Sequence, residues 1–437
     1  MGLTSKDGIF RLAHEDVLTV LNRVLIANAW DLPTTGPSNL QFNRTAETID
    51  SDDPDLTSRQ AKNNIQEWLN DNIFALKQSE DLFKIGFRWD EEDDASPVWW
   101  PQGVTGTADA TESGELDGEK LLVVSWHYQK KEEDSAPGFP EEEGARITVV
   151  KMTNFNEPIV YRHILLVAPT IDEDGLPSFE FMDKLHAGGI VWFDRWLYVA
   201  DGKRLLLFDM SNIKDLAQQM VNIHITGNGR VPTVSLSSKI PDHDSRTDGR
   251  GLEIGWIDGR YEAFGYRYIC PLVAIYTIDP DSDDSLEGHF SSIGLDRSTE
   301  PPRLASAKFI DQEDSTSDFD KDINNALLCF WELNPQTGLL HVSSSGHIEA
   351  TDTFQTNLRF IQGASAKGTT VWLSASSGGL AKLYVRHTDN SGGDEMHFWA
   401  RGCESLTWTP HSNHLWNVTE FEDSRIGFAV DLSDVGG

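Results

Sequence analysis

The stretch HAGGIVWFDRWLYVADGKRLLLFDM, from His186 to Met210, decides the fold expected for this chain. It contains three short hydrophobic runs, at residues 188–193, 196–200 and 205–210, and polar pairs separate them. The pairs are Asp194-Arg195 and Asp201-Gly202, which are typical of tight hairpin turns. The pattern therefore predicts three consecutive antiparallel strands, which make up most of one blade of a β-propeller.

The same pattern recurs imperfectly along the chain. A first unit is expected at residues 101–106, 121–126, 146–152 and 159–168, and the quoted stretch is the second. A third is expected at 268–276, 291–295, 305–309 and 327–333, a fourth at 360–364, 370–374, 381–386 and 396–400, and the last at 404–409, 414–419 and 425–430. These units predict an all-β protein, a β-propeller of five blades, or of six if residues 221–267 hold a weak unit.

Glycine recurs at one place in these units, where the innermost strand begins. It follows Gln102, Ala187 and Gln362, whereas the last unit has Ser405-Leu406 there. Innermost strands converge on the propeller axis, where a missing Cβ relieves crowding. A pair of β-sandwiches is the alternative fold, and it does not explain the recurrent glycine.

The last unit shows only three strands, so it needs a fourth from elsewhere in the chain. Residues 85–89 read as a strand and are expected to complete this sheet and close the ring. Apolar residues at helical spacing predict helices at 8–32 and 58–78. We therefore expect an N-terminal helical segment over 1–80, packed on a propeller that spans 81–437.

The composition limits the partners of this protein. Its 437 residues include 36 basic and 70 acidic ones, which gives a net charge of −34. Nucleic acid and anionic membranes would be repelled, so neither is expected as a partner. No run approaches 18 apolar residues, and Glu15 and Asp16 give the first apolar segment the wrong charge order for a signal peptide. The expectation is a cytoplasmic protein, unless a leader was removed.

Three motifs resemble a known group of proteins. They are Trp99 to Thr105 (WWPQGVT), Tyr161 to Val167 (YRHILLV) and His186 to Phe193 (HAGGIVWF). Over residues 95–215 the chain resembles a family of bacterial and fungal β-propeller proteins, most of them unassigned and many secreted. More loosely, its plan is similar to the propeller-type hetero-Diels–Alderases of fungal tropolone–sesquiterpenoid pathways. The resemblance implies a propeller and, through those enzymes, catalysis without a cofactor.

Common cofactor and nucleophile motifs are missing from the sequence. It has no GxGxxG, P-loop, HExxH or GxSxG pattern. Residues 279–284 imitate the start of a calcium loop but have Asp284 where the turn requires glycine. The cysteines Cys270, Cys329 and Cys403 form no CxxC pair and are expected to be buried thiols. We therefore expect neither a cofactor nor a metal.

The site is expected at the mouth of the central funnel. His186 lies where an innermost strand begins and is the candidate catalytic residue, although a histidine in this place is also common in a core or a turn. Gln102 and Gln362 hold comparable places in two other units and would orient a substrate. Trp100, Tyr268 and Trp408 lie beside the expected inner-strand starts and would line an apolar pocket.

Two classes of function follow from these residues. In the first, the protein is a cofactor-independent biosynthetic enzyme that carries out a cyclisation, cycloaddition or dehydration of a neutral polycyclic substrate, terpenoid or polyketide-like, held in a dry pocket. In the second, it is a non-catalytic propeller that binds a carbohydrate or a protein, with the same aromatic residues stacking on the ligand. The sequence by itself leaves both open.

Overall fold

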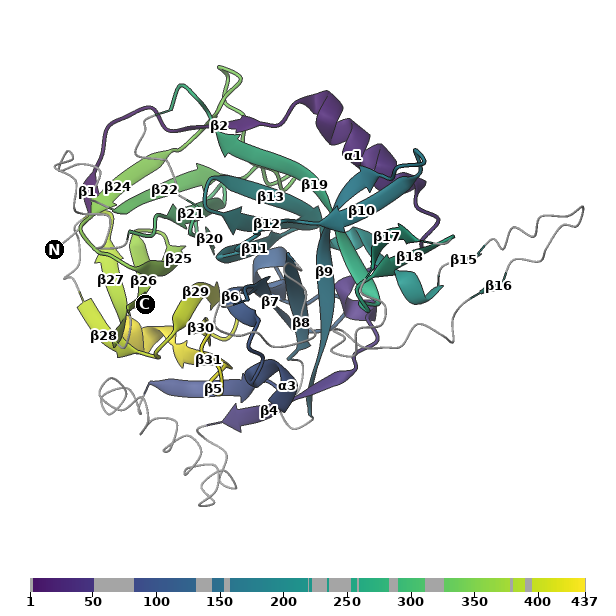
Figure 1. The fold of residues 1–437 in the computed structure, drawn as a ribbon. Coiled ribbons are helices and arrows are strands. Elements are labelled where there is room, and N and C mark those ends of the chain that lie inside the picture. Colours follow the sequence, from purple (N-terminus) through teal and green to yellow (C-terminus); the bar gives the residue numbers. More distant parts are fainter. Residues whose placement is uncertain are drawn as a thin grey trace, which may run out of the picture.

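In the computed structural model of the chain, the described residues are 3–50, 82–130, 144–152, 158–218, 220–221, 234–235, 253–257, 259–282, 290–310, 326–377, 380–389 and 395–436. The described strands pair into four-stranded antiparallel blades that stand around a common axis (Figure 1). Their innermost strands are β6 (Trp99–Gly106), β11 (Gly189–Phe193), β20 (Ser292–Asp296), β25 (Ile361–Lys367) and β29 (Cys403–Thr409). These strands contact one another in that order, and β29 returns to β6. The protein is a β-propeller.

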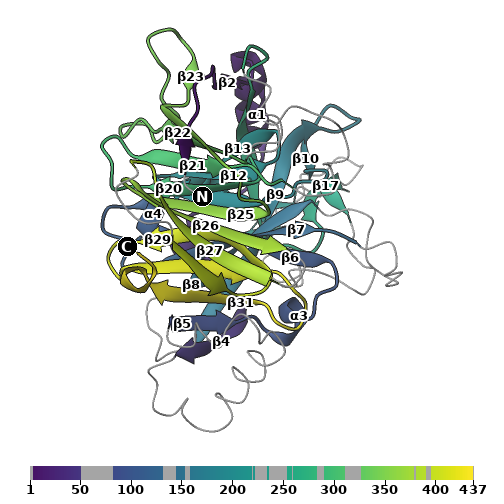
Figure 2. The same cartoon turned by 90° about the vertical axis from the view of Figure 1, so that its left-hand side faces the viewer.

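Each blade continues outward from its innermost strand through hairpins. Blade 1 adds β7 (Leu121–Tyr128), β8 (Ala145–Lys151) and β9 (Ile159–Ile171). Blade 2 adds β12 (Trp196–Asp201), β13 (Arg204–Asp209) and β19 (Tyr268–Ile278). Blade 3 adds β21 (Arg303–Ala307), β22 (Ala326–Glu332) and β24 (Asp352–Thr356). Blade 4 adds β26 (Thr370–Ser377), β27 (Leu380–His387) and β28 (Glu395–Trp399), strands that Figure 2 views from the edge of the ring.

The ring closes as the three-strand last unit predicts. Blade 5 consists of β29, β30 (His414–Thr419), β31 (Ile426–Asp431) and β5 (Phe83–Arg88), and β5 comes from the opposite end of the chain. The short helix α3 (Glu91–Asp94) then leads from β5 to β6, so it joins the last blade to the first. Because β31 and β5 pair with each other, neither strand leaves a free edge where the ring closes.

The N-terminal segment adds strands to the outer edges of the blades. The strand β1 (Thr4–Ser5) pairs with β24, and β2 (Arg11–His14) pairs with β19. The strand β3 (Thr34–Thr35) pairs with β14 (Ile213–Asp215), and β4 (Arg44–Asp50) pairs with both β5 and β9. The predicted helix at 8–32 is shorter than expected: α1 spans Val17–Ala29, and residues 11–14 are a strand because an open sheet edge recruits them. The helix predicted at 58–78 lies outside the described residues.

The remaining elements are short. They are β10 (Pro177–Phe181), β15 (Met220–Val221), β16 (Val234–Ser235), β17 (Ile254–Ile257), β18 (Arg260–Ala263), β23 (Ile348–Glu349), the helix α4 (Thr107–Ala110) and the 3-10 turns η1 (Pro37–Asn39), η2 (Met210–Asn212), η3 (Leu216–Gln218) and η6 (Leu432–Val435). The described strands between 221 and 267 form two-stranded hairpins rather than a four-stranded sheet. No helix within the described ranges is both long and apolar enough to cross a membrane.

The third predicted unit was wrong about its first strand. The run that begins at Tyr268 is β19, the outermost strand of blade 2, and blade 3 instead begins at Ser292. Nearly all of β19 is buried, because β2 and α1 cover it from outside. A buried outer strand has the same apolar composition as an inner one, so the sequence did not separate them.

Successive inner strands approach closely at the recurrent glycines. A Cβ atom on Gly103 would lie 2.8 Å from the Ile190 nitrogen of β11, and one on Gly363 would lie 2.6 Å from the Glu404 carbonyl oxygen of β29. In blade 2 the glycine on the strand is Gly189, and the predicted Gly188 immediately precedes it. These contacts confirm the physical reason for the glycines, which is crowding between neighbouring blades.

Candidate functional site

Three innermost strands have an irregular register at the same place. The pairing with the second strand shifts between Pro101 and Val104 in β6, between Ile361 and Gly363 in β25, and between Cys403 and Leu406 in β29. Such β-bulges re-aim side chains and are common beside active sites. The residues within them include Gln102, Gln362 and Glu404, so three blades present a polar side chain where the inner strand begins.

Contacts join the polar side chains of blades 1, 2 and 5 at this end of the ring. Gln102 donates through Nε2 to Oε2 of Glu420, over 3.3 Å. The His127 and His186 rings stack with centroids 4.7 Å apart and an interplanar angle of 28°. Trp100 pairs with His127 across β6 and β7. We call the set Trp100, Gln102, His127, His186, Glu404 and Glu420 the rim.

Glu404 is the most unusual member of the rim. Glu404 is only 1% exposed, and its Oε1 atom has no hydrogen-bond partner among the described residues. Burial, with a smaller contribution from nearby Glu420, raises the pKa of Glu404 well above its ordinary value. Burial therefore favours the protonated, neutral form of this carboxyl group over the ionised form.

The two rim histidines are neutral at pH 7. Desolvation, followed by the proximity of His186, lowers the pKa of His127 to about 3. His186 is exposed on its outer side, yet the protein packed around its inner side lowers its pKa too, against the opposing effect of Asp201. Each neutral imidazole keeps one nitrogen that accepts and one that donates. The rim therefore presents neutral hydrogen-bonding groups beside an indole ring.

The predicted site residues divide into two groups. The structure places His186, Gln102 and Trp100 together in the rim. Gln362 holds the equivalent bulge in β25 and is half-buried, and its neighbour Gly363 packs against the Glu404 backbone.

Tyr268 and Trp408 lie away from the rim. Tyr268 stands on the outer strand β19, between the guanidinium groups of Arg162 and Arg267, and its hydroxyl accepts from the Gln41 amide. Trp408 is near the end of β29 rather than its start, with the Lys367 ammonium 5.1 Å from its ring centroid. Their predicted positions beside inner-strand starts were wrong, because the sequence suggested the wrong strand for one and the wrong end for the other.

Sequence reasoning missed Glu404 and Glu420 as site residues. For Glu404 a signal exists: Gln102-Gly103, Gln362-Gly363 and Glu404-Ser405 are the same two positions in three blades. Comparing the blades at this offset would have shown a carboxyl group where two others carry an amide. Glu420 follows β30 in a turn, and no local pattern marks it.

A second buried polar cluster lies between blades 5 and 1. The Asp93 carboxylate accepts from Arg146 Nη2 at 2.7 Å, from Tyr161 Oη at 2.6 Å and from His163 Nε2 at 2.9 Å. Arg425 of blade 5 donates through Nη1 to the Asp93 carbonyl oxygen at 2.7 Å. We call Asp93, Arg146, Tyr161, His163 and Arg425 the closing seam.

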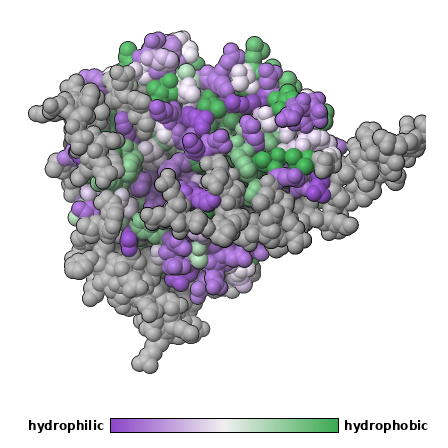
Figure 3. Space-filling view, viewed as in Figure 1, coloured by the Kyte–Doolittle hydropathy of each residue, from purple (hydrophilic) through white to green (hydrophobic). Residues whose placement is uncertain are grey.

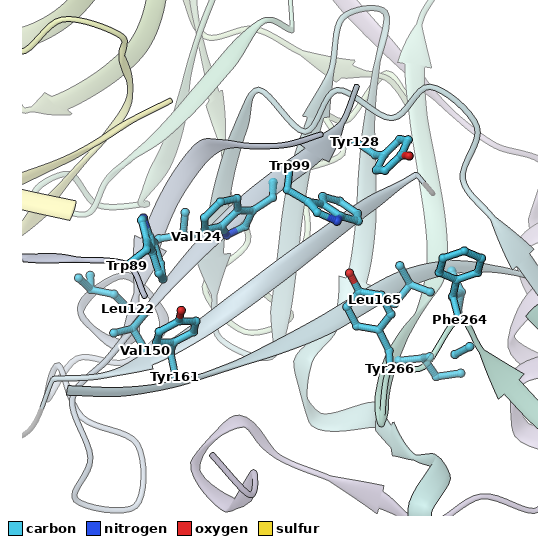
Figure 4. Close-up of a cluster of buried hydrophobic side chains, with 14 of the residues drawn as sticks. Trp89, Trp99, Leu122, Val124, Tyr128, Val150, Tyr161, Leu165, Phe264 and Tyr266 are labelled. Atoms are coloured by element: carbon cyan, nitrogen blue, oxygen red, sulfur yellow. The ribbon is translucent and has the colours of Figure 1, made fainter. Parts of the chain in front are cut away.

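Aromatic residues surround the closing seam. The Arg146 guanidinium lies 4.5 Å from the Trp99 ring centroid and 4.7 Å from that of Trp126. Figure 4 shows the neighbouring hydrophobic cluster, in which Trp89 packs against Tyr161 near the strands of blade 1. Burial by itself raises the pKa of Asp93, but its partners hold it well below its ordinary value. Since the pKa of His163 is lowered to about 3, that ring acts as a neutral hydrogen-bond donor, and Arg146 supplies the charge.

Other features of the described residues are less suited to a functional site than the rim. A polar cleft of about 360 Å³ lies at the outer edge of blade 3, between residues 5–10 and 350–354, and has no residue in common with the rim. The face in Figure 3 mixes hydrophilic and hydrophobic residues in small patches. Within the described part of the chain, no three His, Cys, Asp or Glu side chains are grouped as metal ligands. All three cysteines are buried.

Comparison with other proteins adds a likeness in architecture. The chain matches no known protein family and no curated protein. Among solved structures it is similar to the Dos1 propeller, with 8% identity and a TM-score of 0.27 over 76% of this chain and 71% of the other. It is also similar to the Pan2 WD40 domain of Neurospora crassa, with 8% identity and a TM-score of 0.24 over 77% and 96%. The assignment of the fold rests on the strand pairing described above.

Proposed function

We propose that the protein is a cofactor-independent enzyme that acts at the rim on a neutral organic substrate carrying a carbonyl or hydroxyl group. One observation supports this above the others. Glu404 is a buried carboxyl group, next to a second carboxyl group in the rim, and its Oε1 has no partner among the described residues. A structural carboxylate is normally satisfied by hydrogen bonds, whereas a catalytic one keeps an atom for its substrate.

The proposed chemistry is proton transfer between Glu404 and His186. A protonated carboxyl group can donate to a substrate oxygen at pH 7, which an exposed glutamate cannot do. In a dehydration, Glu404 gives its proton to the leaving hydroxyl as the C–O bond breaks, and His186 takes a proton from the adjacent carbon as the double bond forms. Water leaves, and the proton on His186 returns to Glu404 through solvent, which restores both groups.

The same groups would assist a cyclisation or a cycloaddition. There, Glu404 would polarise a substrate carbonyl without complete proton transfer, and the rim would hold the reacting atoms together. Trp100 offers an indole face, and Gln102 offers an amide that orients an oxygen. These neutral groups favour a neutral polycyclic substrate, terpenoid or polyketide-like, and the hetero-Diels–Alderase-like reaction of natural-product biosynthesis remains within this proposal. Such an enzyme would work in the cytoplasm.

The test is a panel of neutral polycyclic ketones and alcohols, screened for thermal stabilisation and then for conversion by mass spectrometry. For any converted compound, Glu404→Gln and His186→Ala should each lower turnover on the order of 100-fold or more while the ligand still binds. Glu92→Gln, at an exposed carboxylate on α3, is the matched control and should leave turnover unchanged.

Two results would contradict the proposal. Full turnover by both rim variants would remove the proton-transfer role. Stoichiometric binding of a glycan or a protein at the rim, with no compound converted, would favour the binding propeller instead.

A further inference from the structure

The innermost strands have one hydrophobic face and one face of small residues. In β20, Ile293 and Leu295 pack in the core between blades 2 and 3, while Ser292 and Gly294 occupy the alternate positions. In β25, Ala364 and Ala366 are core residues, and Gly363 and Ser365 alternate with them. Alternate residues of a strand point to opposite faces, so the small and hydroxyl-bearing residues share one side.

Two serine hydroxyls on this side lack partners. Ser292 and Ser365 are 0% exposed, and neither Oγ atom has a hydrogen-bond partner among the described residues. By contrast, two serines on second strands are paired: Ser125 Oγ donates to the Ala187 carbonyl at 2.8 Å, and Ser374 Oγ donates to the Glu404 carbonyl at 2.5 Å. The unpartnered and the paired serines therefore differ in their strand within the blade, not in residue type.

The unpartnered hydroxyls lie where inner strands meet near the axis. A Cβ atom on Gly189 would lie 2.9 Å from the Ser292 Cα, and one on Gly294 would lie 3.2 Å from the Ser365 Cα. Ser405 of β29 donates to the Ile293 carbonyl of β20 at 3.4 Å, although these strands are not neighbours in the ring. Only atoms close to the axis can make such a contact.

Hydroxyl groups continue to the other end of these strands. Thr105 of β6 and Thr407 of β29 donate to the Asp109 carboxyl at 2.6 and 2.7 Å, and this residue is only 3% exposed. Residues 404 and 407 are three apart on β29, or about 10 Å along a strand. Glu404 and Asp109 thus stand at opposite ends of one stretch of the axis, with serine and threonine hydroxyls between them.

We propose that the axis of the ring holds a column of ordered water that is hydrogen-bonded to Ser292, Ser365 and the free oxygen of Glu404. A buried hydroxyl without a partner is costly, and buried water that bonds otherwise unsatisfied groups is a regular part of folded proteins. The groups are hydroxyls and a carboxyl beside a second carboxyl, and each can both donate to water and accept from it.

The column gives Glu404 a route for exchanging its proton. This role rests on the proposed function of Glu404, whereas the water site itself does not. Burial raises the pKa of Asp109 to about 6, against the effect of its threonine partners, so the far end of the column also carries an exchangeable proton near neutral pH. Water would then connect two protonatable groups through the middle of the propeller.

The experiment compares melting temperatures of four variants of the full chain in the absence of any substrate. If water satisfies the hydroxyls, Ser292→Ala and Ser365→Ala should each lower Tm by roughly 1–2 °C, as the paired controls Ser125→Ala and Ser374→Ala should. If the two hydroxyls have no partner at all, removing them relieves a cost, and Tm should stay the same or rise. That result would overturn the proposal.

A high-resolution crystal structure provides the second arm. Ordered water within hydrogen-bond distance of both serine hydroxyls is expected, and a dry axis would contradict the proposal. A metal ion there, detected by anomalous scattering and by a fall in Tm on adding EDTA, would also overturn it. None of these measurements depends on turnover, so the water column and the proposed function can fail separately.

Discussion

Two buried carboxyl groups of this propeller, Asp93 in the closing seam and Glu404 in the rim, have opposite surroundings. Asp93 is 3% exposed and accepts hydrogen bonds on both oxygens, from Arg146, Tyr161 and His163. Glu404 is 1% exposed and has an oxygen without a partner in the described part of the chain. The pKa of Asp93 is held below its ordinary value, and that of Glu404 is raised above it.

The difference separates a structural role from a functional one. The seam joins blade 5 to blade 1, and its buried charge is matched by donors, so it fixes how the ring closes. In the rim, Oε1 of Glu404 has no partner among the described residues, and the raised pKa of this group makes its ionised form costly in the fold, a cost that proteins keep where it serves chemistry.

The largest effect is expected from the seam. Asp93→Ala leaves the buried Arg146 guanidinium without its counter-ion and should lower the free energy of unfolding by about 3–5 kcal/mol. Urea unfolding followed by tryptophan fluorescence measures this loss. Glu92→Ala on the same helix removes a carboxylate that is 82% exposed and should cost under about 0.5 kcal/mol. Similar losses for both variants would contradict a structural role for the seam.

The contact between blades 4 and 5 comes next. A methyl group at Gly363 would meet the Glu404 carbonyl oxygen at 2.6 Å and the Ser405 Cα at 2.8 Å, so the backbone of β29 must shift. Gly363→Ala should lower the free energy of unfolding by about 1–3 kcal/mol and displace Glu404 from the rim. Gly36→Ala is the control, since nothing lies within 4 Å of its added Cβ. Equal stability of the two variants would show that the blades are not close-packed there.

The pH dependence of stability should have opposite signs in the two regions. The pKa of Asp93 is depressed in the fold, so its contribution is present at neutral pH and is lost as the pH falls through its folded pKa. The pKa of Glu404 is raised, so its cost is absent at low pH and grows as the pH rises above the unfolded value of 4.5.

Unfolding at pH 4 and pH 7 tests these signs. Relative to the wild type, Glu404→Gln should gain stability between pH 4 and pH 7, because it removes a group that folding must keep protonated. Asp93→Ala should show no such gain, because the pKa of Asp93 lies well below its ordinary value of 3.8 and its carboxylate stays ionised in the fold at both pH values. Parallel behaviour of the two variants would show that both carboxyl groups have the same environment. Glu173→Gln, at an exposed position after β9, provides the baseline.

The smallest effect on stability is expected at His186. Its side chain is exposed on one side and loses only its stacking on His127, so His186→Ala should cost about 1 kcal/mol or less. The same chemical unfolding measurement applies. A loss as large as that of Asp93→Ala would place His186 in the structural framework rather than the functional rim.

Part of the site could be predicted from the sequence. The recurrent glycine located two of the innermost strands, with Gln102 on β6 and His186 just before β11. The role of these residues in a site stays a prediction. Glu404 occupies the same offset as Gln102 and Gln362 and could have been found by that comparison. Tyr268 and Trp408 could not be placed correctly, because a hydrophobic run shows neither which strand of a blade it forms nor which end of the ring it reaches.

The propeller could be predicted from sequence patterns: hairpin turns, short hydrophobic strands and a three-strand last unit that Phe83–Arg88 completes. Which polar residues share an environment depends on contacts between distant parts of the chain. Asp93 meets Arg146 and Tyr161 across more than 50 positions of sequence, and Glu404, which lies in the bulge of β29, is close to Glu420 of the turn after β30. Strand patterns are local, and they fix the fold, whereas the charge state of a buried carboxyl group depends on every atom that the ring brings around it.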